Sequence, residues 1–85
     1  MKKIEILGPG CARCKKTEEE IRRALISIGW QEGHEFVIEK VVRPTEIAAR
    51  GVLMTPGVIL DGKIVSTGKI PTHGEIVSWI EKAEQ

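Results

Sequence analysis

The dipeptide Asp61-Gly62 is the feature that most constrains the fold, because it stands between two short apolar runs at residues 58–60 and 63–67. A two-residue type I′ turn needs a positive φ at both central positions, and Asp-Gly adopts this conformation readily. We therefore predict an antiparallel hairpin in the second half of the chain, and any fold for the sequence must contain it.

Upstream of the hairpin, the chain alternates strand and helix signals. Residues 3–7 form a β-type run that ends at the turn Gly8-Pro9-Gly10. The segment KKTEEEIRRALISIGW then predicts a helix that ends at Gly29. Its apolar positions follow helical spacing: Ile21, Ala24, Leu25 and Ile28. We interpret the run Glu18-Glu19-Glu20 as its solvated face.

Three further elements complete the prediction. Residues 35–42 are rich in β-formers, and residues 44–50 have room for two short helical turns that end at Gly51. After the hairpin, Thr72 and Glu75 are spaced as a capping box for a last helix. The apolar side of that helix consists of Ile76, Val77 and Ile80.

The predicted order is β-α-β-α-β-β-α. Two strands joined through a helix run parallel with a right-handed crossover, whereas the hairpin strands are antiparallel. We therefore predict an α/β fold with a mixed four-stranded sheet and helices on both faces, and a single domain over residues 1–85.

The net charge and the hydropathy of the chain limit the kinds of partner that we expect it to bind. The net charge is only +1, without the basic excess of a nucleic-acid-binding protein or a polybasic membrane footprint. The apolar run near the start is too short for a signal peptide, and no segment approaches the ~20 apolar residues of a membrane span. We expect a cytoplasmic monomer with no nucleic-acid or membrane partner.

Cys11 and Cys14 are the two cysteines of the chain, and they stand at the predicted strand-to-helix turn. Cys11 opens the helix, where unpaired N–H groups and the helix dipole favour a thiolate and should lower the thiol pKa. Arg13, Lys15 and Lys16 add positive charge nearby. Cys14 lies seven residues before Ile21, so it shares the buried stripe. An exposed nucleophile and a sheltered resolving thiol are what dithiol exchange requires.

Two other interpretations of the cysteine pair stay open. A structural disulfide is disfavoured in the cytoplasm, and it would close a very short loop. Zinc usually takes four nitrogen or sulfur ligands, and His34 and His73 are the only additional ones, far apart in sequence. A two-coordinate soft-metal site, or a site shared across a dimer, remains an alternative. In that case the chain is a non-catalytic binding module, or a redox-switched protein contact. The final helix argues against ferredoxin-like metal carriers, which end in a strand.

The motifs GPGCARC, MTPGVILDGKIV and STGKIP together resemble the thioredoxin-fold superfamily, in particular small thioredoxin- and glutaredoxin-like redox-active disulfide proteins of archaea and bacteria. The resemblance implies a thioredoxin-like fold and a thiol-disulfide oxidoreductase that uses Cys11 as nucleophile and Cys14 as resolving thiol. It implies no organic cofactor and no metal. Its partners would be protein disulfide substrates and a reductase or dithiol electron donor.

In that superfamily the peptide bond at the position of Thr55-Pro56 is cis, and the proline packs beside the active-site disulfide. A cis bond is tolerated essentially only before proline. We expect the main-chain groups of Thr55 to pair with an extended substrate segment. The alternative is that Pro56 merely begins an edge strand.

Two departures from the family pattern concern the chemistry. Gly10 stands where thioredoxins usually have Trp, and Ala12-Arg13 matches neither thioredoxins nor glutaredoxins. These two residues help to set the redox potential in the family, which spans roughly −120 to −270 mV. The segment TGKIPTHGE lacks the Gly-Gly-x-Asp pattern with which glutaredoxins bind glutathione, so glutathione is not the expected electron donor.

Three other residues, Glu5, Arg13 and Lys15, have a structural and a functional interpretation. Glu5 stands six positions before Cys11, where thioredoxins bury an acid that helps to transfer the proton of the resolving thiol. We favour the alternative, a solvated Glu5 between inward-facing Ile4 and Ile6. Arg13 and Lys15 either tune the Cys11 pKa or, for Arg13, contact an acidic partner, but exposed solvated side chains are equally compatible. The remaining aromatic and imidazole residues are predicted to pack at the core edge (Trp30, Trp79) or lie on the surface (His34, His73).

Overall fold

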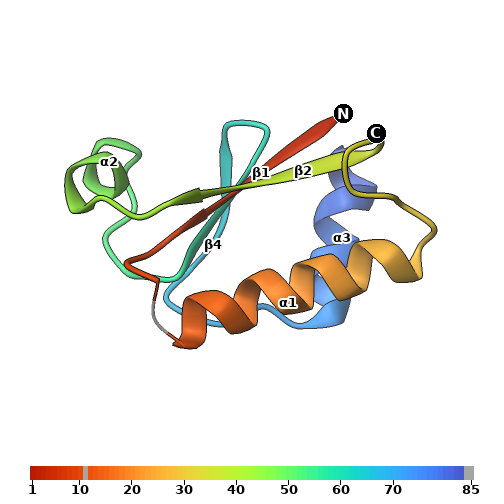
Figure 1. The fold of residues 1–85 in the computed structure, drawn as a ribbon, viewed down its shortest axis with the longest axis horizontal. Helices are drawn as coiled ribbons and strands as arrows, with labels where there is room; N and C mark the ends of the chain where they lie inside the picture. Colours follow the sequence, from red (N-terminus) through yellow and green to blue (C-terminus); the bar gives the residue numbers. More distant parts are fainter. Residues whose placement is uncertain (11, 84–85) are drawn as a thin grey trace.

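The predicted elements all form, in the predicted order. The structure is a computed structural model that describes residues 1–10 and 12–83. Its elements are β1 (Lys2–Leu7), α1 (Ala12–Ser27), β2 (Phe36–Val41), α2 (Pro44–Ala49), β3 (Gly57–Leu60), β4 (Lys63–Thr67) and α3 (His73–Ala83) (Figure 1).

The four strands form one mixed sheet in the order β2-β1-β3-β4. The central strand β1 pairs parallel with β2 and antiparallel with β3, and β3 pairs antiparallel with β4. The β3–β4 turn has φ values of 47° at Asp61 and 86° at Gly62, so both central residues adopt the positive φ on which the hairpin prediction rested. The Lys3 N–H donates to the Asp61 carboxylate over 2.7 Å, which ties the turn to β1.

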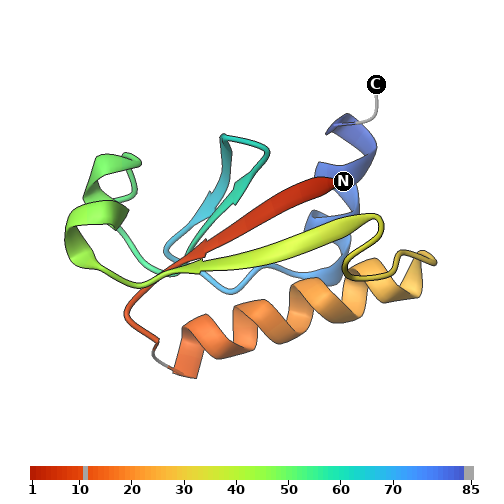
Figure 2. The ribbon, with the colours of Figure 1, turned by 45° about the horizontal axis from the view of Figure 1, so that its top comes forward.

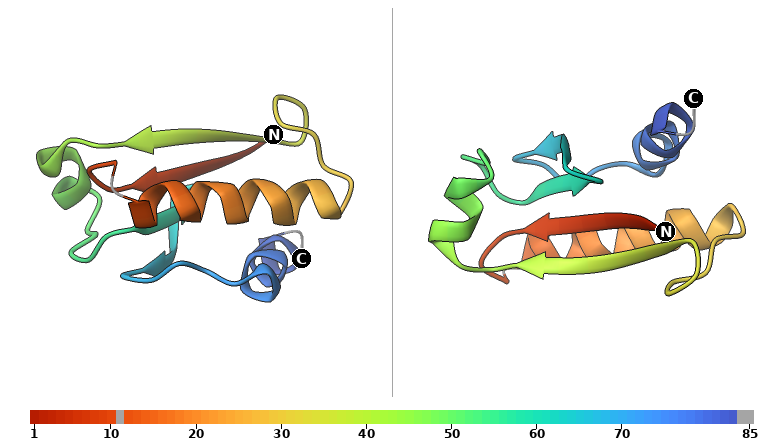
Figure 3. Two further views of the ribbon diagram at one scale, coloured as in Figure 1. Left: turned by 60° about the horizontal axis from the view of Figure 1, so that its bottom comes forward. Right: turned by 90° about the horizontal axis from the view of Figure 1, so that it is seen from above.

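Helices cover both faces of this sheet, also as predicted. Helix α1 runs along one face, beneath β1 and β2 (Figure 2). Helix α3 lies beside α1 on that face, as the left panel of Figure 3 shows. Helix α2 packs on the opposite face through Ile47. No helix in the described part of the chain is long and apolar enough to cross a membrane.

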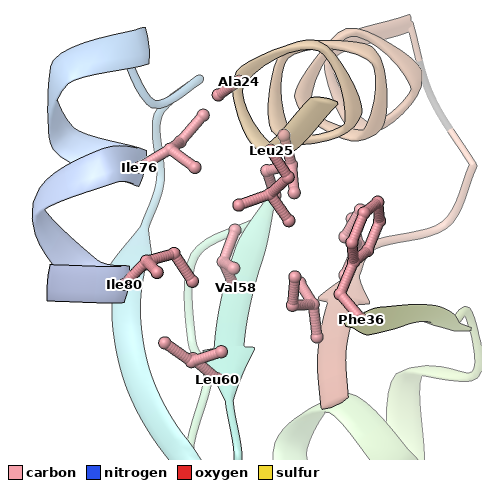
Figure 4. Packing of buried hydrophobic residues seen from close by; sticks show 10 residues of the cluster. Ala24, Leu25, Phe36, Val58, Leu60, Ile76 and Ile80 are labelled. Carbon is pink, nitrogen blue, oxygen red and sulfur yellow. The ribbon is translucent and has the colours of Figure 1, made fainter. Parts of the chain in front are cut away.

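The main core lies between the sheet and the pair α1 and α3. Leu25 of α1 and Ile76 and Ile80 of α3 point toward β3 (Figure 4). The buried members of this cluster are Ile4, Ile6, Ile21, Ala24, Leu25, Phe36, Val58, Leu60, Ile76 and Ile80. Trp30 and Trp79 pack against its edge, which confirms the prediction for both.

A smaller cluster holds α2 against the other face. Its members are Leu7, Val41, Ile47, Val52 and Ile59. Because side chains alternate along a strand, Ile4 and Ile6 face α1 whereas Leu7 faces α2. The sheet is therefore buried on both faces near the end of β1, and this end carries the candidate site.

The helix ends follow the sequence signals, with one correction. At α3, the Glu75 N–H donates to Thr72 Oγ1 over 3.2 Å and the Thr72 N–H donates to Glu75 Oε1 over 3.0 Å, so the capping box is confirmed. The prediction of a buried Ile28 is wrong. Helix α1 ends at Ser27, the Ile28 and Trp30 N–H groups both turn back to the Leu25 carbonyl, and Ile28 is 40% exposed.

The neighbours Leu25 and Ile26 test the packing of α1. Leu25→Ala should lower the free energy of unfolding by about 2–5 kcal/mol, because it opens a cavity in the main core. Ile26→Ala, one position away and 57% exposed, should change it by less than about 0.5 kcal/mol. Urea unfolding measures both values, and equal losses at the two positions would contradict the orientation of α1.

Candidate active site

The candidate site lies where β1 ends and α1 begins. Cys14 is buried in the first turn of α1, with 6% of its surface exposed, in line with its predicted place on the apolar stripe. Cys11, the predicted nucleophile, lies outside the described residues. Its role therefore stays a prediction from the sequence motif.

The absence of a side chain at Gly8 makes room for the Cys14 sulfur. A Cβ atom added at Gly8 would overlap Cys14 Sγ, so the sulfur occupies the space that any other residue's side chain would need. The same added atom would lie 3.7 Å from the Thr55 Cβ. Gly8 is thus the point where three segments meet: the end of β1, the start of α1 and the loop before β3. The sequence indicates only a turn at Gly8, because a requirement for close approach leaves no separate sequence signal.

The Thr55-Pro56 peptide bond is cis, which confirms the expectation from the family resemblance. Pro56 is fully buried and Thr55 is half-buried beside Gly8. Pro56 directly precedes β3, which is an interior strand of the sheet, so the edge-strand alternative is wrong. Cys14 and Thr55 are therefore neighbours beside Gly8.

Arg13, which lies between the two cysteines in the sequence, connects the start of α1 to the loop that contains Pro56. Its guanidinium donates to the Gly68 carbonyl over 2.8 Å, and the Gly68 N–H donates to the Pro56 carbonyl over 2.9 Å. The Met54 side chain lies against Gly68, within 3.2 Å of where a Cβ would stand. The solvated interpretation of Arg13 is therefore incomplete, since the residue links α1 to the loop that follows β4.

The prediction of a solvated Glu5 is wrong. Glu5 is 7% exposed because it lies on the face of β1 that α2 covers, and its Oε2 accepts from Arg50 Nε over 2.8 Å. Ile4 and Ile6 do face inward, as predicted. The sequence reasoning missed Arg50, which caps the end of α2. A buried carboxylate with a cation as hydrogen-bonded partner is a structural ion pair, and Glu5 is not among the residues that line the pocket beside Cys14.

The carboxylate that does share a pocket with Cys14 is Glu18. A small pocket of about 60 Å³ is lined by Ile6, Gly8, Gly10, Cys14, Lys15, Glu18, Lys40 and Val42. Glu18 accepts from Lys40 Nζ and Arg22 Nη1, each over 3.0 Å, and its side chain is only 16% exposed. The prediction of a solvated glutamate run is thus wrong at Glu18, and also at Glu20, whose side chain is 19% exposed. The spacing of four residues between Cys14 and Glu18 was a signal for the first.

The charge state of Glu18 follows from its partners. Burial, the largest single influence, acts to raise the pKa of the Glu18 carboxyl. The hydrogen bonds and positive charges of Lys40 and Arg22 together outweigh burial and hold that pKa below its ordinary value. Glu18 is therefore ionised at neutral pH, and its charge is committed to Lys40 and Arg22.

The other predicted residues lie at the rim or away from the site. Lys15 lines the pocket beside Cys14, and Lys16 turns to Glu20 on the same helix. His34 and His73 are exposed, as predicted, and the His73 Nε2 lies 3.4 Å from Ser27 Oγ. Within residues 1–10 and 12–83, no three His, Cys, Asp or Glu side chains gather in a way that could hold a metal ion.

An apolar hollow adjoins the site on the other side of Thr55. Its volume is about 320 Å³, and its lining residues are Pro9, Pro44, Ile47, Ala48, Val52, Leu53 and Thr55. Leu53 is 91% exposed and Met54 is 64% exposed, although both are large apolar side chains. Exposed apolar residues beside a reactive group are typical of a surface that contacts a partner.

The fold and the site together define a protein of the thioredoxin-like class, with a buried Cys14 beside a cis-proline loop. Comparison with known proteins agrees. Residues 2–81 match the family model of the thioredoxin domain, so the chain belongs to the thioredoxin family. It is 38% identical to a thioredoxin of Methanocaldococcus jannaschii over an alignment of 73 residues, and this alignment covers 86% of the present chain and 79% of the relative. It is 34% identical to a thioredoxin of Methanothermobacter thermautotrophicus over an alignment of 76 residues, and this alignment covers 89% of the present chain and 94% of the relative.

Gly8→Ala tests the close approach at the end of β1. The added methyl group must displace Cys14 Sγ, so we expect the free energy of unfolding to fall by about 1–3 kcal/mol. Gly74→Ala is the matched control, because nothing lies within 4 Å of its Cβ position in α3. It should leave stability equal or higher by up to about 1 kcal/mol. Urea unfolding of the reduced proteins gives both values, and equal stability of the two variants would refute the contact.

Glu18→Gln tests the ion pairs beside Cys14. Because the folded-state pKa of Glu18 is lowered, its carboxylate stabilises the fold above about pH 4.5, and this stabilisation is lost as the pH falls through the lowered pKa. Unfolding free energies measured against pH should therefore decline less steeply in Glu18→Gln than in the parent protein. Glu19→Gln removes the same charge at an exposed position of α1 that has no ion pair in the described structure. Identical pH curves for the two variants would contradict the assignment.

Proposed function

We propose that the chain is a thiol-disulfide oxidoreductase that reduces protein disulfides with its Cys11–Cys14 pair. The observation that carries the proposal is the burial of Cys14 against Gly8, opposite the cis Thr55-Pro56 bond. A sheltered thiol next to a partly exposed recognition loop suits the resolving step, since free disulfides do not reach it and it attacks only the mixed disulfide formed at Cys11. Membership of the thioredoxin family supports the same chemistry.

The reaction is an exchange of disulfide bonds in two steps. The Cys11 thiolate attacks one sulfur of the substrate disulfide, so the substrate S–S bond breaks, a mixed disulfide forms and the leaving sulfur takes a proton. Cys14 then loses its proton and attacks the Cys11 sulfur, which releases the second substrate thiol. The substrate gains two electrons from the Cys11–Cys14 pair and two protons, one from Cys14 and one that Cys11 gave to the solvent when its thiolate formed.

The substrate segment lies along Thr55 in this proposal. The residue before the cis proline is half-buried, and its main-chain groups are suited to pair with an extended chain. Leu53 and Met54, both exposed, supply apolar contact area beside it. The segment thus gains affinity from main-chain hydrogen bonds and from apolar burial.

A reductase or a second dithiol protein returns the electrons in this scheme. The cytoplasm is the compartment that we propose, because a lone close cysteine pair fits a reducing environment, where such pairs are usually catalytic. No resident metal or organic cofactor takes part in the exchange.

Cysteine variants test the proposal. The reduced protein should reduce a protein disulfide such as that of insulin, and Cys11→Ser should abolish the reaction because it lacks the nucleophile. Cys14→Ser should complete the first step only and accumulate a mixed disulfide, which mass spectrometry of the non-reduced protein detects.

The binding-module alternative predicts a different pattern. The parent protein would then retain one soft metal ion per chain, detectable by elemental analysis, and would show no disulfide exchange. Loss of activity in Cys14→Ser without a trapped mixed disulfide would contradict the assigned order of attack.

A further inference from the structure

The cations of α1 fall into two groups. Lys16, Arg22 and Arg23 each form an ion pair with a glutamate, at 2.7–3.5 Å. Arg13 and Lys15, in the first turn beside the cysteines, form no ion pair with any carboxylate of residues 1–10 and 12–83. Among the cations of α1, the two that lie nearest to the candidate site are therefore the two that no such ion pair neutralises.

Arg13 is held in place without being neutralised. Its guanidinium donates to the Gly68 carbonyl, which is a neutral acceptor, and Gly68 in turn is hydrogen-bonded to Pro56. An arginine has five N–H donors, so others remain after this bond. The side chain is exposed and its position is fixed relative to the cis-proline loop, so its charge is preorganised at the mouth of the site.

Lys15 has a carboxylate close by that does not neutralise it. It lines the pocket beside Cys14 together with Glu18. The two oxygens of Glu18 are taken by Lys40 and Arg22. The positive charge of Lys15 therefore remains available to attract a negatively charged group that binds at the pocket mouth.

The stability of α1 does not explain these charges. A helix dipole favours acidic side chains in the first turn, and α2 and α3 follow that rule with Glu46 and Glu75. Helix α1 has no acidic residue in its first turn. Arg13 and Lys15 therefore oppose the dipole, so the stability of the helix gives no reason for their placement.

We propose that Arg13 and Lys15 select protein substrates in which Asp or Glu flanks the reactive cysteine. The proposal rests on the proposed function, since the substrate is the disulfide that lies along Thr55. Carboxylates on such a segment reach the rim of the site as its cysteine reaches the cysteine motif. Rim charges of this kind act mainly on the rate of association, and their effect falls with ionic strength.

Matched peptides test this selection. Three disulfide-linked peptides that differ only in flanking Asp, Asn or Lys are reduced under single-turnover conditions, and each rate is divided by the rate with dithiothreitol, an uncharged dithiol. We expect acidic substrates to react fastest and basic ones slowest, with about three- to fivefold between successive peptides at low salt. The differences should shrink at about 0.5 M salt.

Variants of the helix cations locate the effect. Arg13→Gln and Lys15→Gln should each reduce the acidic-to-basic rate ratio by about threefold, whereas Arg13→Lys, which keeps the charge, should retain most of it. Arg23→Gln is the control, because Arg23 is an exposed arginine of the same helix already paired with Glu20. It should leave the ratio unchanged.

Three outcomes would overturn the proposal. Equal rates for the three peptides would remove the charge preference while leaving the oxidoreductase intact. An equal loss in Arg23→Gln and Arg13→Gln would assign the preference to net charge instead of to the site. Failure to reduce any of the peptides, or insulin, would contradict the proposed function itself.

Discussion

The contact between Cys14 and the backbone at Gly8 is the constraint on which the site depends. The sulfur takes the space of a side chain at the end of β1, so α1 must begin close against the sheet. This close approach is possible because β1 is an interior strand, paired on both sides and covered on both faces. The same stack of layers buries Cys14 and presents Thr55 opposite to it. The geometry of the site is thus a consequence of the core.

Polar side chains around the site form hydrogen bonds and ion pairs that are specific to this sequence. Arg13 links the cysteine motif to the loop at Gly68, and through Gly68 to Pro56. Glu18 is held by Lys40 and Arg22 beside the pocket, and Glu5 is neutralised by Arg50 on the far face. Both of these carboxylates are therefore paired with a cation, whereas Arg13 and Lys15 form no ion pair with the carboxylates of the described residues.

Local signals were sufficient for the fold. The Asp61-Gly62 turn, the capping box at Thr72 and the apolar stripe of α1 as far as Leu25 each depend on neighbours in the sequence, and the structure confirms them. Long-range contacts were not predictable in this way. Glu5 looked solvated because its partner is 45 residues away, and the bond from Arg13 to Gly68 spans 55 residues. The cysteine pair was interpreted from its place at the strand-to-helix turn and Thr55-Pro56 through the family resemblance, but the need for glycine at position 8 appears only once α1 is packed on the sheet.

The most direct test of the account is a redox titration of the two cysteines. The protein is equilibrated in thiol-disulfide buffers of known potential, its thiols are alkylated, and mass spectrometry counts them. The account predicts that both thiols disappear together, in one two-electron transition with a midpoint between roughly −120 and −270 mV. Thiols that oxidise independently, or that stay reduced throughout this range, would show that Cys11 and Cys14 do not form a dithiol couple.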